Sequence, residues 1–203
     1  MPHALVLQFP SAEALPSALL SRLPEPDYTD EKRMRFIVEE GFSLSGADAA
    51  LLDSRQIDHA VLPDRAFGEL GLIVSDMDST LITIECVDEI AAGVGLKDRV
   101  AEITERSMRG ELDFEQSLRS RVALLAGLDE RVLAEVYENV LRLSPGAEFL
   151  LDECKAHGVK FMLVSGGFTF FTERLQQRLG FEYQHANILE IENGKLTGRL
   201  KGR

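Results

Sequence analysis

The sequence is poor in cysteine and in basic residues, and it has no long apolar run. Its two cysteines, Cys86 and Cys154, form neither a disulfide framework nor a metal-binding Cys-x-x-Cys spacing, so free thiols in the cytoplasm are expected. No apolar run approaches the roughly 20 residues that cross a bilayer, and residues 1–16 lack the pattern of a signal peptide. These absences argue against a disulfide-stapled secreted domain and against association with a membrane.

Acidic residues outnumber basic ones. Lys and Arg total 22 against 34 Asp and Glu, which gives a net charge of −12. Phosphate backbones repel such a chain and no local basic patch offsets the repulsion, so nucleic acid is not an expected partner. Apolar residues make up 45% of the 203 residues, enough for one globular domain or two small ones.

The stretch Gly71–Ile82 (GLIVSDMDSTLI) organises the rest of the chain. The apolar run Leu72–Val74 predicts a strand buried on both faces, and Asp76 and Asp78 follow it directly. Residues two apart in an extended chain point the same way, and open α/β sheets bind ligands at the carboxyl ends of strands. One carboxylate can attack phosphorus while the other moves a proton. The pair also suits Mg²⁺.

A plain polar turn is the alternative interpretation of the segment 76–80, because Asp, Ser and Thr are common turn formers. That alternative explains neither the apolar run before the two acids nor the acidic helix predicted after them. The catalytic interpretation is therefore favoured. A second candidate site is Ser165-Gly166-Gly167, between a predicted strand (160–164) and a predicted helix (168–179), where backbone N–H groups favour a phosphate. A simple strand-to-helix turn is the alternative there.

Residues 1–66 predict a small α+β segment. Strands are expected at 3–9 and 33–39, and helices at 12–23 and 45–57, the second capped by Ser45. Nothing in the segment looks catalytic. A regulatory or dimerising module, which would allow a homodimer, and a plain structural appendage both stay open.

Residues 67–203 predict an α/β core with a helical insertion at about 83–143. Amphipathic helices follow Ile82, and their charged residues Asp88, Glu89 and Arg119 are expected to be solvated. A helix capped by Ser144 leads to a second buried, parallel strand at 160–164, and residues 187–200 predict a hairpin. Helices inserted directly after the catalytic strand are placed to cover the site.

The segment 76–82 (DMDSTLI) resembles the first signature of the haloacid dehalogenase superfamily, and with Glu85 and Arg121 the sequence is most similar to its phosphoserine phosphatases. The resemblance covers about residues 70–203. It implies a Rossmann-like parallel sheet with a helical cap, and a Mg²⁺ ion bound by Asp76 and Asp78. The implied reaction is hydrolysis of O-phosphoserine to serine through an aspartyl-phosphate, the last step of serine biosynthesis. Other small phosphomonoesters, such as phosphohomoserine or phosphoethanolamine, stay open as substrates.

The resemblance also implies the remaining binding residues. A phosphoamino acid needs an anion for its ammonium group and an arginine fork for its carboxylate. The family's pattern puts Glu85 and Arg121 in these roles and lets Met108 and Phe114 line the pocket. It puts the phosphate at Ser165, Gly166 and Gly167.

The family's third motif, a lysine followed by Gly-Asp-Gly-x-x-Asp, does not occur in the sequence. Lys201 belongs to the predicted hairpin and does not replace the lysine. Residues 1–203 are therefore expected to bind Mg²⁺ weakly, to hydrolyse phosphoserine negligibly, and to expose an apolar sheet edge that favours association. A Mg²⁺-dependent phosphatase and a truncated or inactive binding domain both stay open.

In a complete enzyme, Asp76→Asn is expected to abolish turnover, because an amide is a poor nucleophile and a weak metal ligand. Asp78→Asn is expected to impair protonation of the leaving group, and to leave Mg²⁺ binding largely intact if Asp78 contributes its backbone carbonyl. Phosphate release and Mg²⁺ titrations of the two variants measure this difference. Substantial turnover by the Asp76→Asn variant would remove Asp76 from the nucleophile role.

Overall fold

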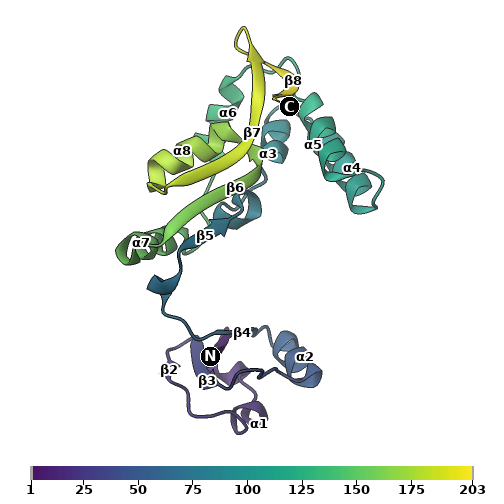
Figure 1. Cartoon of the computed structure of the whole chain (residues 1–203). Coiled ribbons are helices and arrows are strands. Elements are labelled where there is room, and N and C mark those ends of the chain that lie inside the picture. Colours follow the sequence, from purple (N-terminus) through teal and green to yellow (C-terminus); the bar gives the residue numbers. More distant parts are fainter. Residues whose placement is uncertain (1, 203) are drawn as a thin grey trace. The chain divides into compact units, whose positions relative to one another are not determined.

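The computed structural model describes residues 2–202. The chain divides into two units, Met1–Ala66 and Phe67–Arg203, and each is considered by itself (Figure 1). Each unit encloses its own hydrophobic core, as expected of separate domains. Among the described residues, no helix has the length and apolar character needed to cross a membrane.

The first unit is a four-stranded antiparallel sheet with two helices. Its strand order is β2-β3-β1-β4, and Leu5, Leu7 and Phe36 from the central strands are buried with Leu19 and Leu52 from the helices. The elements are β1 (His3–Gln8), α1 (Ser17–Leu20), β2 (Tyr28–Thr29), β3 (Arg33–Val38), α2 (Gly46–Ser54) and β4 (Asp58–Pro63).

The expected helix at 12–23 is wrong. A short 3₁₀ turn at Ala12–Ala14 and the four-residue α1 replace it. Pro16 lies between them with an extended backbone, because proline has no N–H to continue a helix. The predicted cap of α2 is confirmed, since Ser45 Oγ accepts a hydrogen bond from the Asp48 N–H at 3.1 Å.

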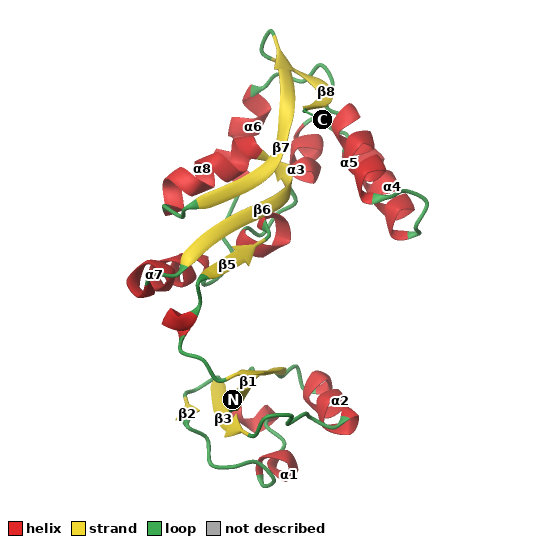
Figure 2. Cartoon of the chain, viewed as in Figure 1, coloured by secondary structure: helices red, strands yellow, loops and turns green. Residues whose placement is uncertain are grey.

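The second unit is built on a sheet of order β5-β6-β7-β8. Neighbouring strands β5, β6 and β7 run parallel, and β8 returns antiparallel to β7. The predicted hairpin is confirmed: Asn193 and Gly194 both have positive φ, as a two-residue type I′ turn requires. The elements are β5 (Leu72–Ser75), α7 (Ala147–His157), β6 (Lys160–Phe168), α8 (Thr169–Leu179), β7 (Tyr183–Glu192) and β8 (Lys195–Lys201), shown by type in Figure 2.

The expectation that β5 is buried on both faces is wrong. Phe161 and Leu163 of the neighbouring β6 are buried in the core with residues of α7 and α8. Leu72 and Val74 point to the opposite face and are 46% and 58% exposed. In the described chain β5 is an edge strand that pairs only with β6.

Between β5 and α7 lies the helical insertion. Its helix α5 starts with the predicted capping box: Asp113 Oδ1 accepts from the Gln116 N–H at 2.8 Å, and Gln116 Oε1 accepts from the Asp113 N–H at 3.1 Å. The helices are α3 (Cys86–Gly93), α4 (Lys97–Met108), α5 (Phe114–Ala123) and α6 (Arg131–Glu135), the last continued by a wider turn at Val136–Val140.

Ser144 does not cap α7 as expected. Gly146, with a φ of +85°, precedes the first helical residue, and no side chain caps this end. The Ser144 N–H instead donates to the Leu81 carbonyl at 3.0 Å, which ties the end of the insertion to its beginning.

The loop after α5 is hydrogen-bonded to the hairpin. Gly127 N–H donates to the Leu196 carbonyl at 2.8 Å, and Leu196 N–H donates to the Leu128 carbonyl at 2.9 Å. A Cβ at Gly198 would lie 2.9 Å from the Ala126 Cβ. Only glycine at this position therefore allows β8 to approach the loop so closely. The insertion is thereby joined to the sheet at a second place.

Phe161→Ala is expected to destabilise the second unit by about 3–5 kcal/mol, because it removes a buried ring that packs against Phe181. Phe149→Ala is the control, since that side chain is 69% exposed on α7. Urea unfolding followed by circular dichroism measures both variants. A loss below about 1 kcal/mol for Phe161→Ala, the size of an ordinary substitution, would contradict the packing described.

Candidate active site

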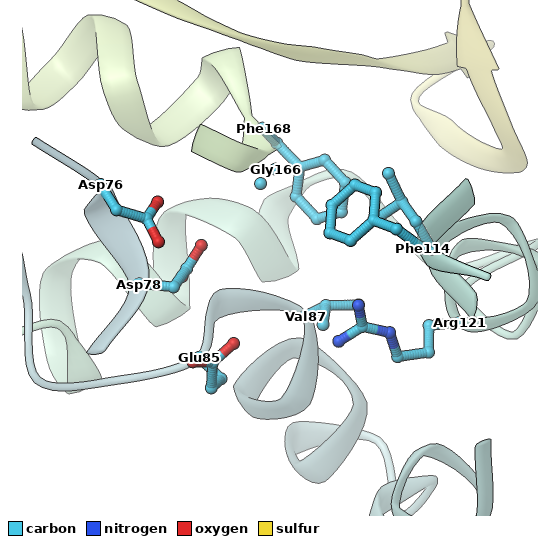
Figure 3. Close-up of a pocket in the computed structure, with 10 residues that line it drawn as sticks. Asp76, Asp78, Glu85, Val87, Phe114, Arg121, Gly166 and Phe168 are labelled. Atoms are coloured by element: carbon cyan, nitrogen blue, oxygen red, sulfur yellow. The ribbon is translucent and has the colours of Figure 1, made fainter. Parts of the chain in front are cut away.

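Asp76 and Asp78 lie at the carboxyl end of β5 and line a cavity of about 130 Å³. Figure 3 shows their carboxylate groups pointing toward the same cavity, with Arg121 reaching in from α5. The cavity is enclosed by the end of β5, the start of α3, helix α5 and the end of β6. Its lining residues are Asp76, Asp78, Glu85, Val87, Phe114, Leu118, Arg121, Gly166, Gly167 and Phe168.

A tight backbone turn at Met77–Leu81 holds the two carboxylates in place. Asp76 Oδ1 accepts from the Met77 N–H at 2.7 Å, and Asp78 Oδ1 accepts from the Cys86 N–H at 2.8 Å. Ser79 has a φ of +53°, and its N–H donates to the Ile84 carbonyl at 3.1 Å. The side chain of Met77 is fully buried and anchors the turn in the core. The Asp-x-Asp motif is thus fixed from both sides.

Burial raises the pKa of the Asp78 carboxyl above its ordinary value, and repulsion from Glu85 and Asp76 adds to this effect. The bond from the Cys86 N–H works in the opposite direction but is outweighed. Ser165 Oγ also lies 3.4 Å from Asp78 Oδ2. A carboxyl group that keeps its proton to higher pH is suited to act as a general acid.

Gly166 and Gly167 line the opposite wall at the end of β6, whereas the neighbouring Ser165 is not among the lining residues. The Gly167 N–H donates to Ser165 Oγ at 2.8 Å, so this N–H is engaged within the protein. The three residues belong to the end of the strand, and α8 begins at Thr169 with Phe168 as its N-cap. The ladder to β7 is irregular between Val164 and Phe168, which bends the strand at the cavity.

Asn187 is a site-forming residue that sequence reasoning missed. Its side-chain amide donates from Nδ2 to the Gly166 carbonyl at 2.8 Å and fixes that wall from the adjacent strand β7. The apolar lining residues Val87, Leu118 and Phe168 were also not predicted. Asn187 carries no local signal in the sequence, because its partner lies on another strand.

Glu85 and Arg121 meet at the cavity, as the resemblance implies. Glu85 Oε1 accepts a hydrogen bond from Ser79 Oγ at 2.7 Å, which orients the carboxylate from the preceding turn. Arg121 is only 16% exposed. Phe114, the first residue of α5, covers Gly166: a Cβ added there would lie 2.7 Å from the Phe114 ring.

The structure does not bring Met108 to the cavity. It is the last residue of α4, its side chain is 85% exposed, and it is not among the lining residues. Its helix buries Val100, near the opposite end. The expectation that Met108 lines the pocket is therefore corrected for this structure.

The cavity offers oxygen ligands of the kind that Mg²⁺ prefers, but few of them. Asp76 and Asp78 supply carboxylate oxygens, and one oxygen of each already accepts a backbone hydrogen bond. Among residues 2–202, no group of three or more His, Cys, Asp or Glu side chains could hold a metal. The residues fit a magnesium ion in chemistry, and most of its six positions would be left to water.

The family model of haloacid dehalogenase-like hydrolases matches residues 73–203. The chain belongs to this family. A phosphoserine phosphatase of Albidiferax ferrireducens is 55% identical to it over 139 residues, which cover 68% of this chain and 59% of that protein. The chain thus spans less than two thirds of the length of this relative.

Two solved structures agree with the haloacid dehalogenase fold. A family hydrolase from Salmonella enterica serovar Typhi superposes with a TM-score of 0.83 at 29% identity, covering 98% of this chain and 72% of that one. A phospho-aspartyl intermediate analogue of phosphoserine phosphatase superposes with a TM-score of 0.61 at 40% identity, covering 66% of this chain and 63% of that one. The α/β fold expected from the sequence is confirmed.

Gly167→Ala is expected to destabilise the second unit by about 1–3 kcal/mol through overpacking. The new Cβ would lie 2.8 Å from Asp78 Oδ2 and 2.9 Å from the Met77 side chain. Gly71→Ala is the matched control, since nothing lies within 4 Å of its Cβ position. Urea unfolding compares the two variants, and equal stabilities would show that the wall is not packed against Asp78.

Proposed function

We propose that the cavity is the active site of a phosphoserine phosphatase, which hydrolyses O-phosphoserine to serine and phosphate. The observation that carries the proposal is the meeting of the paired acids Asp76 and Asp78 with Glu85 and Arg121 in one small cavity. Two of the relatives named above support it, since the Albidiferax ferrireducens protein is a phosphoserine phosphatase and another phosphoserine phosphatase was solved as a phospho-aspartyl intermediate analogue.

Each charged group of phosphoserine has a counterpart in the cavity. Arg121 would bind the carboxylate with its guanidinium fork, and Glu85 would bind the ammonium group. The phosphate would lie between Asp76 and the wall lined by Gly166 and Gly167, where the absence of side chains on the glycines allows a close approach. The volume of about 130 Å³ is below the roughly 300–1,000 Å³ of pockets for drug-sized ligands, so a small metabolite fits best.

The proposed reaction has two steps. In the first, a carboxylate oxygen of Asp76 attacks phosphorus, the bond from phosphorus to the serine oxygen breaks, and Asp78 gives its proton to that oxygen. In the second, Asp78 takes a proton from water as the water oxygen attacks phosphorus and Asp76 is released. The raised pKa of Asp78 favours the protonated form that the first step needs.

Mg²⁺ is part of the proposal, held by the Asp76 carboxylate and by Asp78. When bound, it would offset the negative charges of Asp76 and the phosphate. The lining residues include no lysine that could share this role.

Binding without turnover is therefore the second candidate function for these 203 residues. Its support is the sparse set of metal ligands.

We propose that the protein works in the cytoplasm, in the last step of serine biosynthesis, with a phosphomonoester as its partner. The homodimer expected from the sequence stays a prediction.

Phosphate release from phosphoserine, measured with and without Mg²⁺ alongside calorimetric binding, tests the proposal. Mg²⁺-dependent release supports the phosphatase. Binding without release favours the second candidate, and this is the outcome expected for residues 1–203 alone because the third motif is absent. If phosphoserine neither binds nor reacts, both candidates are wrong.

Arg121→Lys is expected to weaken phosphoserine binding by about 1.5–3 kcal/mol, because lysine cannot make the bidentate contact with a carboxylate. Phosphoethanolamine, which lacks the carboxylate, should be affected much less. Calorimetric titration of both ligands into both proteins gives the comparison. Equal losses of binding free energy for the two ligands would contradict the assignment of Arg121 to the substrate carboxylate.

A further inference from the structure

Arg121 is buried without a complete set of partners. Its side chain is 16% exposed, and its Nε finds no hydrogen-bond partner among the described residues. A guanidinium has five N–H donors in a fixed planar arrangement. The direction in which the outer donors point therefore depends on the groups that contact the edge facing the protein interior, which is called the inner edge below. Burying a charged donor without a hydrogen-bond partner costs free energy, so a nearby acceptor for the Arg121 guanidinium is expected.

Asp88 faces Arg121 from α3. Its Oδ1 is also buried without a partner in the described chain, and it lies 4.0 Å from Arg121 Nη1. This separation exceeds the roughly 2.7–2.9 Å of a charge-assisted hydrogen bond by about 1 Å. Two complementary, unpaired groups thus oppose each other across a short gap. Asp88, expected from the sequence to be solvated, is partly so: its side chain is 38% exposed, but Oδ1 is buried.

Asp88 lies one helical turn beyond Glu85, on the same side of α3. Glu85 lines the cavity, whereas Asp88 does not. Because Asp88 faces Arg121 and does not line the cavity, an effect of Asp88 on a ligand would pass through the Arg121 guanidinium. We propose that Asp88 is a positioning residue that holds the inner edge of the Arg121 guanidinium and so turns its free edge toward the ligand carboxylate.

The charges around Asp88 agree with this role. Burial raises the pKa of its carboxyl, and Glu85 and Glu89 raise it further, while Arg121 and Lys97 lower it. Arg121 is the stronger of the two cations in this balance. Arg121 is the strongest influence that opposes burial and the two acidic neighbours, so it favours the charged form of the Asp88 carboxyl.

Two measurements test the proposal, and only one of them depends on the proposed function. In the ligand-free protein, carbon NMR follows the titration of the Asp88 carboxyl. Its pKa should rise in Arg121→Gln and stay unchanged in the control Arg119→Gln, because Arg119 lies on the same helix but pairs with Glu115. An unchanged Asp88 pKa in Arg121→Gln would overturn the proposal.

The second measurement rests on the proposed function, since it uses phosphoserine as the ligand. Asp88→Asn should weaken phosphoserine binding on the order of tenfold, should leave phosphoethanolamine nearly unaffected, and should be partly rescued by Asp88→Glu. Glu89→Gln, the same charge change one residue away, is the control. Equal weakening of both ligands, or tighter binding of phosphoserine through reduced repulsion, would overturn the positioning role. If the unmodified protein binds neither ligand, the proposed function fails, and the NMR titration still decides whether Asp88 and Arg121 are coupled.

Discussion

The hydrogen bond from the Cys86 N–H to Asp78 is the interaction on which the candidate site depends. It joins the end of β5 to the first turn of α3, so the catalytic turn and the helical insertion are fixed to each other. The same carboxylate lies against Ser165 and Gly167 at the end of β6. One half-buried carboxyl group therefore connects three of the four parts of the chain that enclose the cavity: the ends of β5 and β6 and the start of α3. Its raised pKa comes from the same burial that fixes its position.

Elements with strong local signals could be predicted from the sequence. The structure has the hairpin turn at Asn193-Gly194, the capping box at Asp113 and the N-cap at Ser45. Each of these depends on neighbours only a few residues away. The helix at 12–23 failed because Pro16 interrupts an otherwise helical pattern. The exposure of Val74 could not be read from its apolar run, because burial depends on what else packs against the sheet.

The candidate site divides in the same way. Asp76, Asp78 and the glycines at 166 and 167 stand directly after apolar runs, so their clustering at one sheet edge follows from the strand pattern. Nothing local distinguishes Arg121 from Arg119, and only the family resemblance pointed to it. Asn187 and Asp88 face partners far away in the sequence, so sequence reasoning predicted neither contact.

The hydrogen bonds between the hairpin and the loop after α5 restrict how that helix can move. Backbone hydrogen bonds hold Gly127 and Leu128 to Leu196, so rotation of α5 against the sheet must pivot near its C-terminal end. Arg121 is close to this pivot, whereas Phe114 is about 10 Å further along the helix at 1.5 Å per residue. A small rotation about this end would move Phe114 away from Gly166 and leave Arg121 nearly in place. It would open the cavity beside Gly166 without changing the position of the guanidinium at the other end.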